Sequence, residues 1–208
     1  MPEFKRKEAE FIASQYKEKL YTKYDIHENV KVMNQSDLVE MYLDNTWRPN
    51  LSITGADHLP PIAQAGNVLR PKTAVKVSLR LCPAMDAHKA EEILTEKLTK
   101  DVPYNAKVTI EGGHAGSGWR MRDLEKNLSD AIAEAGAAFF DGKPTGSYGE
   151  GGSIPFLNEL GKKFPHSQIV AFGLLGPNSN AHGPNESINL KYAKKLTCSL
   201  AHIIAACG

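Results

Sequence analysis

Apolar side chains recur at every third or fourth position over several parts of the chain, which is the spacing of one face of a helix. Near the N-terminus, Ile12, Tyr16 and Leu20 follow this spacing with charged residues between them, so we expect helices over much of the first 45 residues. A second, short helix is expected over residues 37–44, and Ser36 is its expected N-cap. The same pattern predicts helices over residues 86–98, 128–139, 153–160 and 193–204.

Strict alternation of apolar and polar residues predicts a strand over residues 73–81. Val75 and Val77 would lie on one face of this strand, whereas Lys76 and Arg80 would lie on the other. The second face would therefore meet solvent or a ligand. Further strands are expected over residues 50–55, 107–111 and 167–175. The last of these is almost continuously apolar, which is typical of a strand buried on both faces of a sheet.

The order of these elements divides the chain into two parts. Up to residue 111 the order is helix, strand, strand, helix, strand, which becomes the split β-α-β-β-α-β arrangement of ferredoxin-like domains if one strand is added at the front. Residues 112–118 are rich in glycine and form the expected linker. We therefore predict an α/β protein with an α+β domain over residues 1–112, lacking its first strand, and an α/β segment over residues 113–208.

The composition excludes several classes of protein. Lys plus Arg number 25 and Asp plus Glu number 24, so the formal net charge is +1. A protein that binds nucleic acid usually carries a clear excess of positive charge, so we do not expect nucleic acid as a partner. No stretch approaches the roughly 20 consecutive apolar residues that a membrane span needs. Three cysteines without a C-x-x-C pair are typical of reduced thiols, so we expect a cytoplasmic protein.

One of the seven histidines is distinguished by its position. His182 lies in the polar loop over residues 176–186, directly after the apolar strand expected over residues 167–175. Loops at the carboxyl ends of strands are where open α/β sheets bind ligands, and an imidazole there could bind zinc through one nitrogen. The alternative is that His182 is simply a solvated loop residue.

Three other residues are candidates for contacting a substrate. Ser153 follows a Gly-Gly pair, where backbone N–H groups and a hydroxyl can approach a ligand closely; the alternative is an ordinary tight turn before a helix. Arg80 could hold a carboxylate with two guanidinium nitrogens, or it could be a solvated residue on the sheet. Asn67 could donate its amide to an oxyanion, or it could be a simple turn residue.

A series of short motifs along the chain resembles a known family. The motifs are, in order, WRP at 47–49, LSITG at 51–55, GNVLRP at 66–71, SLRLCP at 78–83, EGGSIP at 150–155 and AHGPNE at 181–186. Their order and spacing resemble the dinuclear-zinc metallopeptidase family of cytosolic nonspecific dipeptidases, carnosinases, aminoacylases and succinyl-diaminopimelate desuccinylases. The first four are similar to the family's lid domain, and the last two are similar to its C-terminal signatures. The Gly-Gly-Ser-Ile-Pro form is most similar to the dipeptidase and carnosinase branch.

The resemblance implies roles for the four candidate residues. His182 matches the last zinc ligand, Arg80 matches the arginine that holds the substrate's C-terminal carboxylate, and Ser153 matches a substrate-binding residue beside that carboxylate. Asn67 matches the lid position that reaches the substrate carbonyl across a dimer. The resemblance also implies two zinc or manganese ions in the complete enzyme, a dipeptide substrate, and a homodimer formed through the ferredoxin-like lid.

The sequence also departs from this family. It contains no His-x-Asp pair, and the adjacent Glu91 and Glu92 fall on the exposed side of a lid helix rather than in the family's metal-binding Glu-Glu pair. One ligand is too few for two zinc ions, since a catalytic zinc takes about three protein ligands. We therefore expect the C-terminal half of a zinc-dependent dipeptidase, inactive by itself. The alternatives are a non-catalytic dimerisation or binding module and an amidohydrolase of the same family that acts on N-acyl amino acids.

Overall fold

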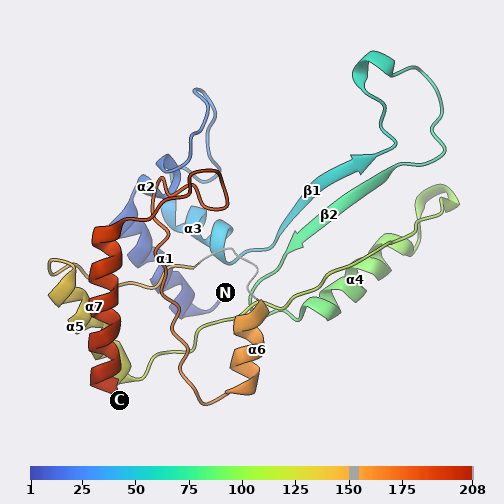
Figure 1. Cartoon of the computed structure of the whole chain (residues 1–208). Coiled ribbons are helices and arrows are strands. Elements are labelled where there is room, and N and C mark those ends of the chain that lie inside the picture. Colours follow the sequence, from blue (N-terminus) through green and yellow to red (C-terminus); the bar gives the residue numbers. More distant parts are fainter. Residues whose placement is uncertain (150–154, 208) are drawn as a thin grey trace.

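The computed structural model describes residues 1–149 and 155–207. Figure 1 shows a helical body that contains the N-terminus, a long β-hairpin that projects from it with a helix alongside, and a pair of helices at the C-terminal end. The elements are, in chain order, α1 (Glu3–Tyr16), α2 (Lys19–Thr22), α3 (Leu38–Thr46), β1 (Asn50–Asp57), β2 (Ala74–Arg80), α4 (Ala87–Thr99), α5 (Lys126–Phe139), α6 (Pro155–Lys163) and α7 (Leu190–Cys207), with short 3-10 turns at Ile62–Gln64 and Pro103–Asn105.

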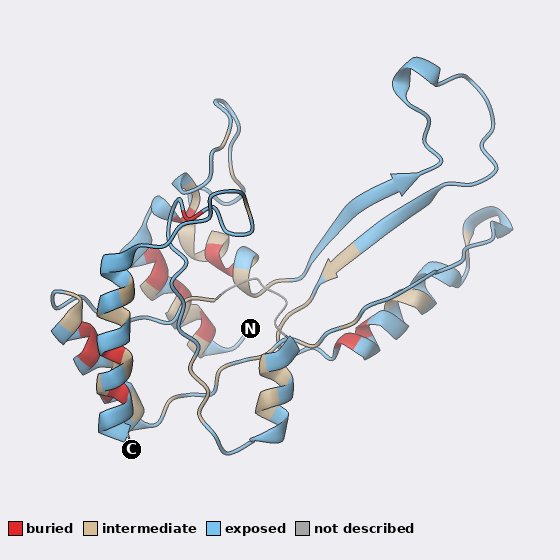
Figure 2. Cartoon of the chain, viewed as in Figure 1, coloured by how far each residue is buried: buried red, intermediate tan, exposed pale blue. Residues whose placement is uncertain are grey.

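The helical body is held together by an apolar core between α1 and α3. Leu43 is completely buried, and Ile12 and Tyr42 are each 2% exposed; these buried segments are red in Figure 2. Burial of a side chain the size of leucine or isoleucine contributes about 1.5–3 kcal/mol. The predicted helical stripe is confirmed at Ile12, whereas Tyr16 is nearly half exposed and packs its ring against that of Tyr148.

Polar groups also lie inside this core. The hydroxyl of Tyr42 donates a hydrogen bond to Glu8 Oε1 over 2.8 Å and accepts one from the N–H of Gly149 over 2.6 Å. Lys5, which is 4% exposed, binds the same Glu8 oxygen over 2.6 Å. Burial raises the pKa of Tyr42, and the hydrogen bond to Glu8 adds to this shift.

The N-terminus of α3 is capped by an aspartate. Oδ1 of Asp37 accepts hydrogen bonds from the N–H groups of Val39 and Glu40 over 3.1 and 3.0 Å. Ser36, the N-cap expected from the sequence, is therefore one residue too early. A carboxylate in the Asp37 position satisfies two N–H groups that have no partner within the helix, and its charge is favourable at the positive end of the helix dipole.

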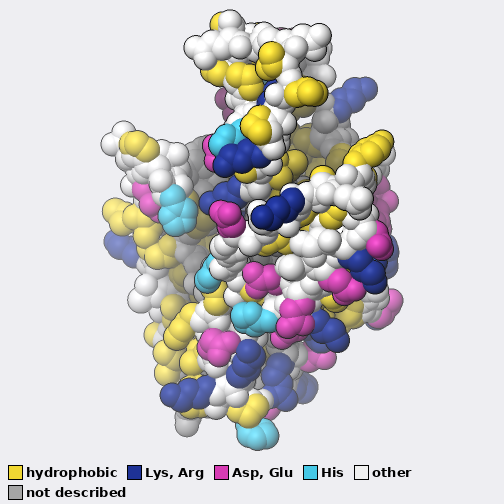
Figure 3. All heavy atoms as spheres, turned by 90° about the vertical axis from the view of Figure 1, so that its right-hand side faces the viewer, with side chains coloured by type: hydrophobic (Ala, Val, Ile, Leu, Met, Phe, Trp, Pro, Cys, Tyr) yellow, Lys and Arg dark blue, Asp and Glu magenta, His cyan; other side chains and the backbone are white. Residues whose placement is uncertain are grey.

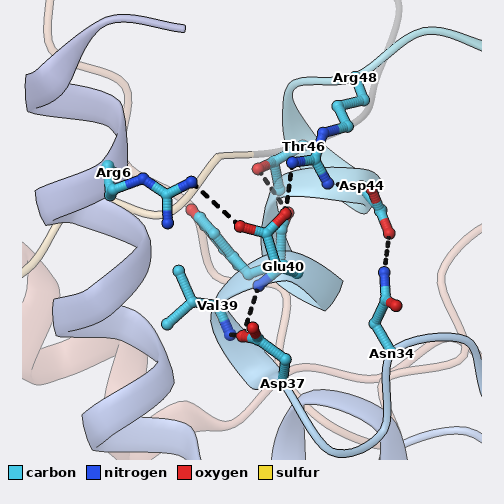
Figure 4. A network of polar contacts seen from close by, with 9 residues as sticks. Arg6, Asn34, Asp37, Val39, Glu40, Asp44, Thr46 and Arg48 are labelled. Carbon is cyan, nitrogen blue, oxygen red and sulfur yellow. Dashed lines mark hydrogen bonds and ion pairs between the residues drawn. The ribbon is translucent and has the colours of Figure 1, made fainter.

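An ion-pair network around Glu40 joins α1, α3 and the start of the hairpin. Glu40 accepts a hydrogen bond from Arg6 over 3.0 Å and another from Arg48, which also pairs with Asp44 over 2.5 Å; Figure 4 shows these contacts. The bonds from Arg48 and then Arg6 lower the pKa of Glu40. Because Pro49 and β1 follow Arg48 directly, the network fixes the direction in which the chain leaves the helical body.

β1 and β2 form an antiparallel hairpin with two different faces. Ile53 lies opposite Val77 on one face, and Asn50 lies opposite Arg80 on the other. The alternation predicted for residues 73–81 is therefore confirmed. The apolar face is left uncovered, since Ile53 is 63% exposed, and the hairpin is pale blue along most of its length in Figure 2.

α4 begins at Ala87 with Asp86 as its N-cap, as the sequence predicts; Oδ1 of Asp86 accepts an N–H from the first turn over 2.9 Å. The chain then returns along α4 towards the helical body (Figure 1). On this return Ser117 Oγ accepts the N–H of Ala87 over 3.1 Å. Gly118 lies so close to Pro83 that an added Cβ would be 3.0 Å from the proline Cα. These two contacts fix the returning chain to the base of the hairpin.

Two strands expected from the sequence do not form. Residues 107–111 and 167–175 are not strands in the structure, and within the described residues the only ladder joins β1 to β2. A strand needs a neighbour that takes up its backbone hydrogen bonds, and neither segment has one there. Of the helix expected over residues 153–160, the described part is helical from Pro155 onwards, and residue 153 itself lies outside the described residues.

α5 and α7 pack against each other around a second, smaller core. Ala131 and Ala135 of α5 are buried with Ile203 of α7, and Figure 2 shows these buried turns facing one another. The helices predicted over residues 128–139 and 193–204 are confirmed. Among the described residues, no helix has the length and apolar character needed to cross a membrane.

We predict that Glu40→Gln destabilises the fold at neutral pH and that this effect shrinks on acidification. The pKa of Glu40 in the folded chain is below its ordinary value of 4.5. Its carboxylate therefore stabilises the fold above that value and loses the contribution as the pH falls through the folded-state pKa. Urea unfolding from about pH 7 down to about pH 3 measures the difference from wild type. Glu10→Gln, on the exposed side of α1, is the control. If the stability difference between wild type and Glu40→Gln grows as the pH falls, the ion-pair role of Glu40 is contradicted.

Tyr42→Phe tests the buried hydroxyl with the opposite pH dependence. Loss of its two hydrogen bonds should cost about 1–3 kcal/mol at neutral pH. The pKa of Tyr42 is raised in the folded chain, so its contribution is fully present below the ordinary value of 10.0 and is lost as the pH rises towards the folded-state pKa. Urea unfolding up to about pH 11 should show wild type approaching Tyr42→Phe. The half-exposed Tyr16→Phe is the control, and a constant difference across this range would count against a buried hydroxyl.

Candidate functional site

The loop that carries His182 is a compact turn closed by its own hydrogen bonds. The N–H of Gly176 donates to Ser179 Oγ over 3.0 Å, and the N–H of Ser187 donates to the Ser179 carbonyl over 2.9 Å. Asn180 Nδ2 donates to the carbonyl of Pro184 over 2.6 Å. Ser179 is buried, so it forms the centre around which the loop is wound.

His182 lies on the outside of this loop. Its backbone is in the left-handed region with φ of 62°, a conformation that costs about 1 kcal/mol or more for a residue other than glycine. Its N–H donates to Glu186 Oε2 over 3.3 Å, and the residue as a whole is exposed. The loop therefore holds the backbone of His182 and leaves the residue accessible to a ligand.

Arg80 lies at the end of the hairpin that is nearest the helical body. It is the last residue of β2, is exposed, and lies opposite Asn50 at the start of β1. Asn50 follows Arg48 by two residues, so the network around Glu40 also positions this end of the hairpin. A guanidinium on an exposed polar face has donors in the arrangement that a carboxylate accepts.

Asn67 lies at the opposite end of the hairpin, exposed in the loop that joins β1 to β2. The strand between them runs from Ala74 to Arg80, and at about 3.3 Å per residue it separates the two ends by roughly 20 Å. The structure therefore does not bring Asn67 and Arg80 together within one chain.

Ser153 lies outside the described residues, and the structure places the residues on either side of the Gly-Gly-Ser motif. Before the motif, the N–H of Gly149 is bound by the buried hydroxyl of Tyr42. After it, Pro155 begins α6 and packs against Gly116, where an added Cβ would be 3.3 Å from the proline Cγ. Both flanks of the motif are thus in contact with other parts of the chain.

The described side chains do not fit a two-zinc site. Within the described part of the chain, no group of three or more His, Cys, Asp or Glu side chains is arranged to hold a metal ion. His182 has Glu186 close to its backbone, and Glu91 and Glu92 are exposed on α4, as the sequence predicts. Since a catalytic zinc takes about three protein ligands, these residues supply at most one part of such a site.

Sequence reasoning missed the buried polar group formed by Lys5, Glu8 and Tyr42. One signal was available, because Lys5 has the helical spacing of Ala9 and Ile12 and so lies on the buried stripe of α1. A buried lysine needs a charged or polar partner, and Glu8 is one turn away. Nothing in the sequence indicated that this group would bind Gly149, which is far along the chain.

Comparison with known proteins adds relatives in sequence and in fold. No family model matches the chain. It is 27% identical over 154 residues to a cysteinylglycine-S-conjugate dipeptidase of Corynebacterium striatum, a match that covers 70% of this chain and 32% of that protein.

Similar solved structures are peptidases about twice as long as this chain. An M20 family metallo-carboxypeptidase from Sulfolobus solfataricus superimposes with a TM-score of 0.65 at 19% identity, covering 99% of this chain and 45% of the other. The di-peptidase Dug1p from Saccharomyces cerevisiae superimposes with a TM-score of 0.62 at 21% identity, covering 91% of this chain and 42% of the other. Human carnosine dipeptidase 1 superimposes with a TM-score of 0.65 at 18% identity, covering 99% of this chain and 43% of the other.

These matches confirm the predicted resemblance and the predicted α/β fold. The chain spans about a third of the curated relative and less than half of each similar structure. The four candidate residues are not tested by the matches, and their roles remain predictions. The chain therefore has the fold of part of an M20 metallopeptidase and is related in sequence to a dipeptidase.

Proposed function

We propose that this chain is the C-terminal part of a metal-dependent dipeptidase that cleaves dipeptides with a free C-terminal carboxylate. The observation that carries the proposal is the relationship to a dipeptidase over 154 residues, which runs through a chain with a metallopeptidase fold. Because the chain spans less than half of the similar structures, the complete reaction belongs to a longer polypeptide.

Arg80 is the residue that we assign to the substrate's carboxylate. It is exposed on the polar face of the hairpin, at the end held by the Glu40 network. A guanidinium binds a carboxylate through two parallel hydrogen bonds, which fixes the orientation of the substrate as well as its charge. Ser153, which follows the Gly-Gly pair, is assigned to the same carboxylate as a hydroxyl donor.

Asn67 is assigned to the substrate carbonyl in the site of a second copy. Its amide would stabilise the negative charge that develops on that oxygen during hydrolysis. The roughly 20 Å of strand between Asn67 and Arg80 supports this assignment, because one chain does not offer both side chains to one dipeptide.

His182 is assigned as one ligand of a zinc or manganese ion. Its exposed position in a tightly bonded loop supports this role, and the further ligands would come from outside the described residues. A metal ion bound there would polarise the scissile carbonyl and activate a water molecule. The chain's own contribution is to orient the dipeptide through Arg80 and to present His182.

A second candidate function is a non-catalytic dimerisation or binding module. The observation that favours it is the lack of any three-donor metal cluster in the described part of the chain. In either case we place the protein in the cytoplasm, because its three cysteines contain no C-x-x-C pair and none of the three is paired in the structure.

A homodimer through the hairpin is part of the proposal. Ile53 and Val77 are exposed on one face of the hairpin, and Ile62 and Leu69 are almost fully exposed in the loop at its tip. Figure 3, which looks at the hairpin side, shows apolar side chains gathered on the projecting end. Exposed apolar surface of this kind marks a contact with another protein, and a second copy is the partner that would bring Asn67 to a substrate.

The first test of this proposal is hydrolysis. The purified chain, supplied with Zn²⁺ or Mn²⁺, should release no amino acids from cysteinylglycine above a metal-only blank. The chain extended by the coding sequence in frame before Met1 should contain a His-x-Asp pair and a Glu-Glu pair, and should cleave dipeptides. Faster cleavage of N-acyl amino acids would favour an amidohydrolase. Chelator-sensitive hydrolysis by the 208-residue chain alone would overturn the prediction that it is incomplete.

The second test is the oligomeric state. Sedimentation velocity should show a dimer for wild type, and Ile53→Lys with Val77→Lys should shift it to monomer because a charge would be buried in the apolar contact. Ser52→Lys with Ser78→Lys adds the same charge on the polar face and should leave the dimer intact. A wild-type chain that stays monomeric at high concentration contradicts a contact through the hairpin.

A further inference from the structure

The segment that leads into the Gly-Gly-Ser motif is bound by a buried polar group at the far end of the sequence. We call residues 146–149 the stem. The N–H of Gly149, the last residue of the stem, donates to the hydroxyl of Tyr42 over 2.6 Å. That hydroxyl donates in turn to Glu8 Oε1 over 2.8 Å. Tyr42 is 2% exposed, so the contact is shielded from water.

Lys5 stabilises the acceptor of this chain of hydrogen bonds. Its Nζ binds the same oxygen of Glu8 over 2.6 Å and lies 5.0 Å from the centre of the Tyr42 ring and 5.8 Å from that of Trp47. A buried ammonium and a largely buried carboxylate hold each other in a fixed arrangement, since separating them would leave a charge unpaired away from water. The hydroxyl of Tyr42 is therefore oriented by Glu8 and is available to receive the stem.

The stem also fits α1 and α3 closely in shape. A Cβ on Gly146 would overlap the ring of Phe11, and one on Gly149 would lie 3.0 Å from Thr46 Cβ. Tyr148 packs its ring edge against Tyr42, with the ring centres 5.4 Å apart. Two glycines in four residues therefore allow the backbone to lie directly on the helices.

We propose that Tyr42 is a positioning residue for the proposed dipeptide site: with Glu8 and Lys5 behind it, it holds in place the stem, which leads in sequence into the Gly-Gly-Ser motif. The inference rests on the proposed function for its link to substrate. Tyr42 does not touch the substrate itself; it acts through Gly149. A site assembled from separate parts of a chain binds well only when each part is held in place beforehand, since ordering it on binding costs affinity.

The first measurement is amide exchange in the 208-residue chain, followed by NMR. Tyr42→Phe keeps the ring and removes both hydrogen bonds, so the amide of Gly149 should exchange about tenfold faster or more. Amides in the middle of α1 and α3 should keep their rates, and Tyr16→Phe should change nothing at Gly149. An unchanged Gly149 amide overturns the proposal, and so does an equal acceleration throughout α1 and α3, which would mean a general loss of stability.

Gly146→Ala tests the same stem by a different change. The added methyl group overlaps the ring of Phe11, so the stem or this ring must shift while Tyr42, Glu8 and Lys5 all remain. The Gly149 amide should again exchange faster. Gly173→Ala, at a position where an added Cβ has open space, is the matched control. This variant decides the question if Tyr42→Phe fails to fold.

The second measurement is the affinity for cysteinylglycine, titrated by NMR into the same variants. Tyr42→Phe and Gly146→Ala should each raise the dissociation constant about fivefold, because the stem is no longer ordered in advance, whereas Tyr16→Phe and Gly173→Ala should match wild type. Arg80→Lys, which removes the two-nitrogen contact, should weaken binding in its own right. Faster exchange at Gly149 with unchanged affinity overturns the role of Tyr42 in the site.

The two measurements separate the two proposals. If the wild-type chain and Arg80→Lys both fail to bind the dipeptide, the substrate assigned under the proposed function is wrong. The exchange rates at Gly149 then still decide whether Tyr42 positions the stem. If wild type binds and Arg80→Lys weakens it, the substrate assignment stands, and the Tyr42→Phe affinity alone decides the link between the stem and the site.

Discussion

A buried hydroxyl must be hydrogen-bonded, and in this chain that requirement joins parts that are distant in sequence. Tyr42 binds Glu8, 34 residues away, and Gly149, 107 residues away. The apolar core of the helical body consequently takes in Tyr148, from well beyond the glycine-rich segment at residues 112–118. The N-terminal helices thus connect the hairpin, which follows them directly, with the stem in the second half of the chain.

The hairpin shows the opposite arrangement, in which little is buried and each face has its own chemistry. Its polar face ends at Arg80 and its apolar face carries Ile53 and Val77. The base of the hairpin is fixed by ion pairs around Glu40 and by the contact of Gly118 with Pro83, whereas the tip makes no comparable contact within the described residues. A stiffly mounted arm with an exposed apolar face is suited to reach another molecule while its base stays in place.

Local patterns predicted the elements that depend on local interactions. The alternation around Val77 and the capping by Asp86 are properties of a few neighbouring residues, and both are confirmed. The sequence pattern did not separate Asp37 from Ser36 as the N-cap, because both residue types cap helices and the two are adjacent. The structure uses Asp37, whose carboxylate is the stronger acceptor at the positive end of the helix dipole.

What the sequence did not predict depends on distant partners. Residues 107–111 and 167–175 have the composition of strands, but a strand exists only where another backbone pairs with it, and none of the described residues does so. The same holds for the contact of Tyr42 with Gly149, which no local spacing encodes. For the candidate site, the sequence selected Arg80 as a carboxylate contact and His182 as a metal ligand. Both residues are exposed, and their roles stay predictions; the sequence could not indicate how each is held.

Different local networks hold the parts of the chain that carry the candidate residues. Arg80 is positioned through the Glu40 ion pairs, His182 through the bonds around Ser179, and the stem through Tyr42. The contacts named for each network lie within the described residues. Preorganisation of this kind is what a catalytic site needs from its scaffold. Under the proposed function these networks would form the framework of a peptidase site, and the described residues alone do not supply a sufficient set of metal-binding side chains.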